Sequence, residues 1–338
     1  MCHNEIISDT KQIKCFPAEF EKQSFVQLIF PHEQSDWIDY LEEARLTFVN
    51  IAQAIAKYET CLIVCDDVAL VKSYFSDFTN LEFVEFQTND TWARDCSAIT
   101  IIENGEKKLL NFTFTGWGGK FDAHLDNAMS QALAPYYKTP METIDFILEG
   151  GGIESNAKGL LLTTSECMLN PNRNKNYTKE QTTELLKEKL GVNEVLYLDH
   201  GYLAGDDTDS HIDTLARFVD EKTIMYLTCK DKNDEHFEAI SQMEAQLQEF
   251  AAQYNLELIA LPFTDAIYYD DERLPATYAN FLIINGAVIV PTYGVRQDDE
   301  ALQIFRDFFK DRDIVGVDCS VLIRQHGSLH CVTMQFGA

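Results

Sequence analysis

Short apolar segments with strand-like composition recur along almost the whole chain, and amphipathic segments with helical spacing separate them. The strand candidates are residues 25–30, 61–65, 81–86, 97–102, 109–114, 160–164, 195–198, 214–219, 223–228, 256–261, 281–290, 314–323 and 328–335. The helix candidates are residues 37–58, 123–133, 179–190, 234–254 and 298–309. One helix for every two or three strands predicts an α+β fold, because a parallel sheet would alternate strands and helices strictly.

Two pairs of strand candidates predict hairpins. The first pair, residues 97–102 and 109–114, flanks Asn104-Gly105, a dipeptide that favours a tight turn. The second pair consists of residues 217–220 and 223–227.

The composition is that of a folded chain without membrane segments. Its 338 residues are 46% hydrophobic, and no Pro- or Gly-rich linker divides them, so we expect residues 1–338 to form a single domain. The polar start lacks the apolar core of a secretion signal. The longest apolar run, residues 278–293, is too short and too polar to span a bilayer, and we expect no membrane association.

The formal net charge of −28 argues against nucleic acid as a partner, because phosphates require a basic patch. A negative surface steers small cations towards a cleft, although acidity also serves solubility. The charge therefore favours a cationic small molecule without identifying it.

The nine cysteines occur singly apart from Cys61 and Cys65, whose spacing fits neither a redox pair nor a zinc knuckle. We expect reduced thiols and a cytoplasmic protein. Most of the cysteines lie in apolar runs, where cysteine packs as a small hydrophobe. Cys331, close to the C-terminus, is the candidate nucleophile, and its candidate partners lie far upstream.

One acidic segment surrounds a histidine. Asp207, Asp209, His211 and Asp213 alternate, so an extended strand would project all four side chains from one face. An exposed acidic turn is the simpler interpretation. A divalent metal site is a third, although the paired-histidine helix motif of metallohydrolases is absent.

Further acidic and aromatic residues suit a planar cation. A guanidinium group presents five donors in a flat fork and therefore needs carboxylates around its edge. Asp95 follows a strand candidate, and Glu149 precedes three glycines that let backbone approach a ligand closely. Trp92 and Trp117 could supply flat walls for such a cation, although each tryptophan alone is more often part of the core.

His330 is adjacent to Cys331 in sequence and is a candidate base. If both residues lie in a strand, however, their side chains point to opposite faces. We therefore expect His330 to be structural.

Eight segments of the chain resemble, in order, blocks of the agmatine deiminase family. They are residues 16–20 (FPAEF), 91–95 (TWARD), 116–120 (GWGGK), 149–153 (EGGGI), 161–164 together with 169–174 (LLTT with LNPNRN), 207–213 (DTDSHID), 278–281 (YANF) and 330–333 (HCVT). The resemblance thus covers nearly the whole chain.

The resemblance implies a pentein fold, an α/β-propeller of five ββαβ modules around a pseudo-fivefold axis. It implies hydrolysis of agmatine to N-carbamoylputrescine and ammonia, without metal or organic cofactor, and usually a homodimer. Cys331 would be the nucleophile, His211 the general acid and base, and Asp95 and Asp213 the guanidinium clamp. Glu149 would lie beside the histidine and touch the substrate.

Alternatives remain open from the sequence. Residues 325–329 (QHGSL) depart from the glycine-triplet loop that is more common in this family, which weakens the choice of agmatine over free or peptidyl arginine. A non-catalytic polyamine-binding protein and a metal-dependent hydrolase are the other candidates.

Overall fold

The computed structural model describes residues 14–338. Its strands are β1 (Lys14–Cys15), β2 (Gln23–Ile29), β3 (Thr60–Cys65), β4 (Leu81–Glu85), β5 (Ile99–Glu103), β6 (Glu106–Thr113), β7 (Met141–Ile147), β8 (Glu154–Ser155), β9 (Leu160–Thr164), β10 (Glu194–Leu198), β11 (Ala216–Phe218), β12 (Thr223–Leu227), β13 (Glu257–Leu261), β14 (Tyr268–Tyr269), β15 (Glu272–Arg273), β16 (Leu282–Ile284), β17 (Ala287–Thr292), β18 (Asp313–Asp318) and β19 (Thr333–Gly337). Its helices are η1 (Ile38–Tyr40), α1 (Leu41–Ala56), α2 (Val68–Lys72), α3 (Ala93–Cys96), α4 (Gly116–Gly119), α5 (His124–Tyr137), η2 (Gly150–Gly152), α6 (Ser165–Met168), α7 (Lys179–Leu190), η3 (Ile212–Thr214), α8 (Phe237–Tyr254), α9 (Asp298–Phe308) and η4 (Leu322–Gln325).

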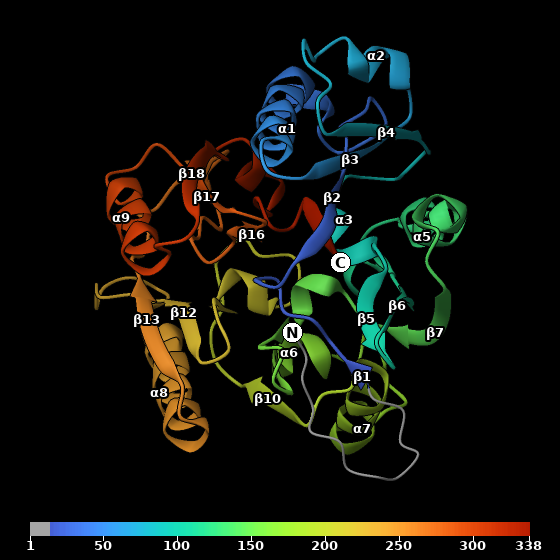
Figure 1. Ribbon diagram of the computed structural model, residues 1–338. Helices are drawn as coiled ribbons and strands as arrows, with labels where there is room; N and C mark the ends of the chain where they lie inside the picture. The colour runs from blue at the N-terminus through green and yellow to red at the C-terminus, as the bar shows by residue number, and fades with distance from the viewer. Residues whose placement is uncertain (1–13) are drawn as a thin grey trace.

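One local topology recurs in five of the sheets in this part of the chain. An antiparallel strand pair is followed by a helix and then by a strand that lies parallel to the second strand of the pair. The sets are β5-β6-α5-β7, β8-β9-α7-β10, β11-β12-α8-β13, β16-β17-α9-β18 and β19-β2-α1-β3. In Figure 1 the helices α5, α7, α8 and α9 lie at the periphery, and the short helices α3 and α6 lie nearer the centre.

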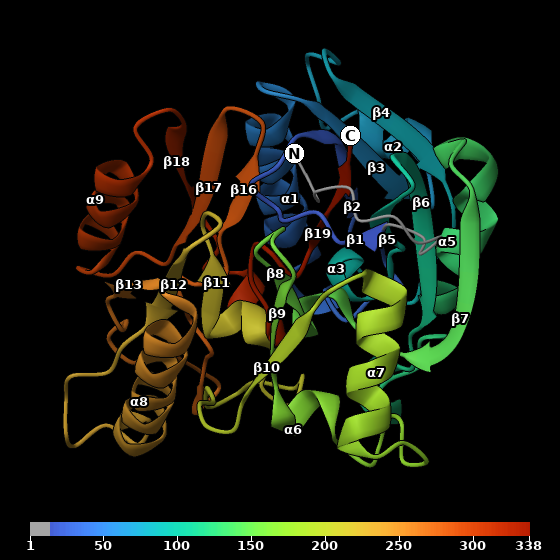
Figure 2. The same cartoon turned by 60° about the horizontal axis from the view of Figure 1, so that its bottom comes forward.

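The fifth of these sheets joins the two ends of the described chain. β19 pairs antiparallel with β2, with Thr333 opposite Leu28 and Phe336 opposite Phe25. In Figure 2, β19 lies beside β2. Because Cys331 lies two residues before β19, its position depends on a strand pairing between opposite ends of the sequence.

The sheets pack through buried apolar strands. β3 carries Leu62, Ile63 and Val64 in an uninterrupted buried run, as expected for a strand covered on both faces. β7 escaped the sequence analysis because Glu142 and Asp145 interrupt its apolar character. Its Ile144 and Phe146 are nonetheless buried, so only one face of β7 is apolar.

Most of the predicted strands, all five predicted helices and both predicted hairpins are present. The predicted strand at residues 281–290 is two strands, β16 and β17, joined at Asn285-Gly286. In the predicted strand at residues 314–323, β18 ends at Asp318 and η4 follows. The helix predicted to end at residue 133 continues as α5 to Tyr137 through Pro135.

The prediction of an extended strand across residues 207–213 is wrong. Asp209 and Ser210 have φ angles of 65° and 61°, and η3 begins at Ile212. The Asp206 carboxylate causes this turn, because it accepts hydrogen bonds from the backbone N–H groups of Thr208 and Ser210, at 3.3 and 2.7 Å. The alternating acidic side chains therefore do not share a strand face.

The predicted strand at residues 328–335 is also wrong in its first half. The backbone N–H groups of His330 and Cys331 donate to Oδ1 of Asn280, at 2.8 and 3.3 Å, and not to a neighbouring strand. The strand β19 starts only at Thr333. The argument that His330 and Cys331 face opposite sides of a strand therefore does not apply.

Within residues 14–338 no helix is long and apolar enough to cross a bilayer. The thiols of Cys61, Cys65, Cys96, Cys167, Cys229, Cys319 and Cys331 are free and buried. Cys15 is disulfide-bonded, so the expectation of reduced thiols is wrong at that position.

Truncation of Phe336 tests the pairing of the chain ends. The ring is 2% exposed and stacks on Phe25 with centroids 4.5 Å apart. We expect Phe336→Ala to lower the free energy of unfolding by about 3–5 kcal/mol, because it leaves a cavity. Denaturant unfolding measures this change, with Phe78→Ala, at a half-exposed ring, as the control. Equal effects of the two substitutions would contradict the central role of this pairing.

Candidate active site

One cleft brings together four of the residues singled out from the sequence: Trp92, Asp95, Trp117 and Cys331. The cleft has an empty volume of about 610 Å³, open solvent included. Its lining residues are Asp36, Asp90, Trp92, Asp95, Trp117, Phe121, Asp207, Thr208, Gln325, His326, Gly327 and Cys331. The other three predicted site residues, Glu149, His211 and Asp213, are fully buried: Asp213 contacts Cys331, His211 lies near Asp95, and Glu149 lies near His211.

Two donors hold Asp95, which lies in α3. Its Oδ1 accepts a hydrogen bond of 2.9 Å from the backbone N–H of Gly151, and its Oδ2 accepts one of 3.0 Å from Nε1 of Trp117. Burial raises the pKa of Asp95, while the nearby His211 opposes that rise. Trp117 therefore has a second role besides lining the cleft, since it orients this carboxylate.

Cys331 lies between polar groups at the cleft. Its Sγ is 3.3 Å from Nδ2 of Asn280 and 3.8 Å from Oδ2 of Asp213. Burial and the carboxylates of Asp213 and Asp95 raise the pKa of this thiol well above its usual range. In the free protein the sulfur is therefore a neutral thiol at pH 7.

The two carboxylate oxygens of Asp213, which lies in η3, differ in their hydrogen bonding. Its Oδ2 lies 2.7 Å from Nδ1 of His330, whereas Oδ1 is buried without a hydrogen-bond partner among the described residues. Burial works to raise the pKa of Asp213, but the hydrogen bond from His330 outweighs it and lowers that pKa. An ionised oxygen without a donor is suited to receive a cationic ligand.

His211 lies between two carboxylates. Its Nδ1 is 3.7 Å from Oδ1 of Asp95, and its Nε2 is 3.8 Å from Oε2 of Glu149. Burial alone would lower the pKa of His211, but Asp95, the Cys167 thiol and Glu149 outweigh it and raise that pKa well above its usual range. The imidazole is therefore protonated at neutral pH.

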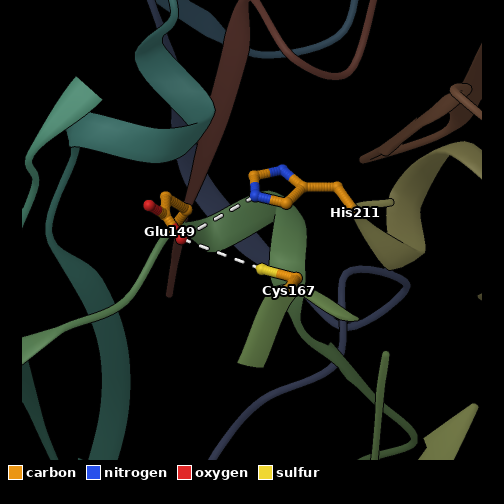
Figure 3. A group of neighbouring side chains, drawn as sticks. All are labelled: Glu149, Cys167 and His211. Atoms are coloured by element: carbon orange, nitrogen blue, oxygen red, sulfur yellow. Dashed lines mark hydrogen bonds and ion pairs between the residues drawn. The ribbon is translucent and has the colours of Figure 1, made fainter. Parts of the chain in front are cut away.

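Glu149 interacts with both His211 and Cys167 through Oε2, as the dashed lines in Figure 3 show. Nε of Arg173 lies 3.0 and 2.8 Å from its two carboxylate oxygens, and the Sγ of Cys167 lies 3.9 Å from Oε2. Burial works to raise the pKa of Glu149, but His211 and the Arg173 guanidinium hold it below the usual range. Glu149 is thus an anion within a charged network.

The donor atoms of Glu149, Cys167 and His211 all lie within 4.8 Å of one another. These are ligand types that zinc accepts. The guanidinium of Arg173 nevertheless contacts both oxygens of Glu149 and would repel a cation placed there.

The glycines of η2 explain how these groups come so close together. A Cβ atom added at Gly151 would lie 2.6 Å from Nδ1 of His211, 3.0 Å from Oδ1 of Asp95 and 3.1 Å from Oδ2 of Asp213. Any larger residue at position 151 would therefore push these three side chains apart. From the sequence we expected these glycines to let the backbone approach a ligand closely. In the structure they let the backbone approach the side chains of the site.

Several neighbours of the site were not assigned a role from the sequence. Arg173, Asn280 and Cys167 contact Glu149 or Cys331, and Asp90 lines the cleft. Arg173 and Asn280 lie inside segments that resemble the agmatine deiminase family, so that resemblance could have indicated both residues. Nothing in the sequence pattern indicated Cys167 or Asp90.

Trp92 contributes one wall of the cleft and is tied to Asp90. Its Nε1 donates to Oδ2 of Asp90 at 3.1 Å, and its ring lies at 77° to that of Trp117, with centroids 6.3 Å apart. The other oxygen of Asp90 is buried without a hydrogen-bond partner among the described residues.

The raised pKa of Cys331 can be tested by alkylation. Neutralising the nearby carboxylate with Asp213→Asn should lower the pKa of the thiol, and each unit of decrease raises the thiolate fraction about tenfold. We therefore expect faster reaction of Cys331 with iodoacetamide at pH 8, followed by peptide mass spectrometry. Asp122→Asn, an exposed change outside the cleft, is the control and should leave the rate unchanged. A slower reaction in Asp213→Asn would contradict the electrostatic account.

Comparison with known proteins shows the family. Residues 15–336 match the Porphyromonas-type peptidyl-arginine deiminases. The agmatine deiminase of Stutzerimonas stutzeri is 31% identical, and the alignment covers 94% of each chain.

Solved structures agree with this match. A cysteine-to-serine variant of C. jejuni agmatine deiminase with substrate bound is 39% identical, with a TM-score of 0.95 over 99% of both chains. A Porphyromonas gingivalis protein, provisionally called an arginine deiminase, is 44% identical, with a TM-score of 0.92 over 96% of this chain and 98% of that one. An amidinotransferase from Microseira wollei, 9% identical with a TM-score of 0.51, shares the fold alone.

The fold is thus the mixed α/β fold of the solved agmatine deiminase structures, and the match extends over nearly the whole sequence. On these grounds the chain belongs to the Porphyromonas-type peptidyl-arginine deiminase family, together with the agmatine deiminases.

Proposed function

We propose that this chain is an agmatine deiminase, which hydrolyses agmatine to N-carbamoylputrescine and ammonia. The observation that carries the proposal is a reactive residue type, Cys331, in an acidic cleft beside the buried carboxylates of Asp95 and Asp213. Relatives named agmatine deiminase match over nearly the whole chain. No metal or organic cofactor has a step in this reaction.

Asp95 and Asp213 would hold the guanidinium group. Its planar fork of N–H donors fits carboxylates placed around one edge, and Oδ1 of Asp213 is a buried acceptor that lacks a protein donor. Uneven contacts would localise the positive charge and make the central carbon a better electrophile. Trp92 and Trp117 would pack against the flat cation.

Cys331 would attack that carbon as a thiolate. The thiol is neutral in the free protein, and the positive charge of bound agmatine favours loss of the thiol proton to solvent. Formation of the carbon–sulfur bond gives a tetrahedral adduct. Loss of ammonia then leaves a covalent amidino-cysteine, which water converts to the ureido product with release of the thiol.

His211 would transfer the protons in both halves of the reaction. Its imidazolium would protonate the departing ammonia, and the resulting neutral imidazole would take a proton from the attacking water. Glu149, fixed by Arg173, keeps the imidazole charged and in place. We also assign Glu149 a contact with the substrate.

The acidic rim supports agmatine over arginine. Of the twelve described residues that line the cleft, three are aspartates besides Asp95, and none is lysine or arginine. An α-carboxylate would find no guanidinium or ammonium partner there, whereas the free amine of agmatine would meet Asp90. Burial, with Asp36 and Asp126 nearby, raises the pKa of Asp90 to about 7. A bound ammonium would relieve that penalty.

The fold fits the same assignment. We propose that the five recurring β-β-α-β sets are modules of a propeller around a pseudo-fivefold axis, and that residues 1–338 form one domain. The pairing of β19 with β2 closes such a ring. A homodimer of such domains is part of the proposal.

Turnover with agmatine tests the reaction. The wild-type protein should release ammonia and a ureido product, and Cys331→Ala should abolish turnover while retaining agmatine binding. Cys229→Ala, at a buried thiol outside the cleft, is the control and should remain active. Activity that disappears with a chelator but survives Cys331→Ala would favour the metal-hydrolase alternative. Agmatine binding without turnover in the wild type would favour a polyamine-binding protein.

Substrate competition tests the assignment of the rim. We expect kcat/KM to be at least tenfold higher for agmatine than for arginine or an arginine peptide. Asp90→Asn should raise KM for agmatine roughly tenfold, because it removes a buried partner for the ammonium. Asp145→Asn, an exposed change on β7, should not. A preference for arginine or its peptides would overturn the choice of substrate.

A further inference from the structure

His330 makes hydrogen bonds to two carboxylates at once. Its Nδ1 lies 2.7 Å from Oδ2 of Asp213, and its Nε2 lies 2.7 Å from Oε2 of Glu19. The exposed fractions of Glu19, Asp213 and His330 are 5%, 0% and 1%. No role in the reaction has been assigned above to Glu19 or His330.

The geometry constrains the protons of this group. A neutral imidazole has one N–H donor, and an ionised carboxylate accepts only. Two short hydrogen bonds from one ring to two carboxylates therefore require either an imidazolium or a protonated acid.

Glu19 is not the protonated member. Its Oε2 forms ion pairs with Nη2 of Arg217 at 3.0 Å and with Nη2 of Arg94 at 3.5 Å, and its Oε1 accepts from the backbone N–H of Ile283 at 2.7 Å. Although burial opposes it, these cations and His330 lower the pKa of Glu19 far below its usual range. Asp213 is the other acid that could hold the shared proton, but a carboxyl group, with an ordinary pKa of about 4, loses its proton more readily than an imidazolium, with an ordinary pKa of about 6.5. The proton therefore lies on His330, and both ring nitrogens donate.

We propose that Glu19 and His330 are positioning residues for the reaction at Cys331: Glu19 keeps His330 doubly protonated, and the His330 imidazolium fixes Oδ2 of Asp213 while leaving Oδ1 for the substrate. This inference rests on the proposed function for the part that Asp213 plays in catalysis. It assigns a role to the histidine beside the nucleophile that differs from both a base and a purely structural residue.

The consequence lies in the charge and orientation of Asp213. Its Oδ2 is 3.8 Å from the Sγ of Cys331, so rotation of the carboxylate would disturb the clamp and the nucleophile together. A displacement of about 1 Å at such a group can cost on the order of a hundredfold in rate. The charged and titratable groups that act on Asp213 are His330, His211, Arg217, Arg94, Asp95 and Cys331.

The network also contains a matched control. Glu154 is a second buried carboxylate on Arg217, at Nε, but it makes no hydrogen bond to His330. Glu154→Gln therefore replaces a carboxyl group in the same network without removing a partner of the imidazole. A role limited to fold stability would make Glu19→Gln and Glu154→Gln alike.

A first experiment needs no substrate. In protein with ¹⁵N-labelled histidine, long-range ¹H–¹⁵N spectra of the wild type at pH 7 should show two histidines with both ring nitrogens protonated, His211 and His330. The signal that is lost in His330→Gln is the signal of His330. Glu154→Gln should keep the signal, and Glu19→Gln should lose or shift it. A neutral His330 ring in the wild type at pH 7 would overturn the proposal, whether or not the protein turns over agmatine.

A second experiment measures the reaction. With agmatine, Glu19→Gln and His330→Gln should lower kcat/KM at pH 7 by about tenfold or more. The acid limb of the profile of kcat/KM against pH should move up by about one unit, because Asp213 loses its neighbouring cation and its pKa rises. Glu154→Gln should keep the wild-type profile and lose less than about threefold in kcat/KM.

The outcomes separate the two proposals. If Glu19→Gln fails to fold, His330→Gln and the wild-type spectrum still decide the matter. Identical pH profiles in wild type, Glu19→Gln and His330→Gln would show that both residues have only a structural role, which would contradict the proposal. A wild type that shows the imidazolium signal but no deimination would refute the proposed function while leaving the protonation of His330 established.

Discussion

Buried carboxylates without enough fixed counter-charge are the constraint on which this site depends. Asp95, Glu149 and Asp213 are almost inaccessible to water, and burying an ion is costly unless it is paired. The protein pairs Glu149 with Arg173 and one oxygen of Asp213 with His330. The other oxygen of Asp213 has no donor among the described residues, and the negative charge of the site raises the pKa of both Cys331 and His211. In the proposed reaction the positive charge of the substrate neutralises the remaining negative charge of the carboxylates.

The fold brings these groups together from distant parts of the sequence. Asp95, Glu149 and Asp213 lie in or beside short helices, and Cys331 lies two residues before the strand that pairs with β2. Loops and helix starts carry the chemistry while the sheets fix their positions, as in many enzymes. The glycines of η2 then permit a closer approach than side chains would allow.

Much of this could be predicted from the sequence, and the failures have physical causes. Local apolar patterns predicted most strands because burial on a sheet leaves a periodic signal, and Asn104-Gly105 predicted a hairpin correctly. The alternation from residue 207 to residue 213 was misleading, because a side chain at Asp206 turns the backbone there. The family resemblance supplied Cys331, Asp95 and their partners. The contact of Arg173 with Glu149 and that of His330 with Glu19 could not be predicted, because these residues are distant in the sequence and come together only in the fold.

The most direct test of the account is mass spectrometry of the protein quenched during incubation with agmatine. The account predicts an amidino group attached to Cys331, and slower formation of this adduct in His211→Gln, because the imidazolium of His211 protonates the departing ammonia. An unmodified Cys331 peptide under conditions of ongoing turnover, or an adduct on another cysteine such as Cys167, would contradict it.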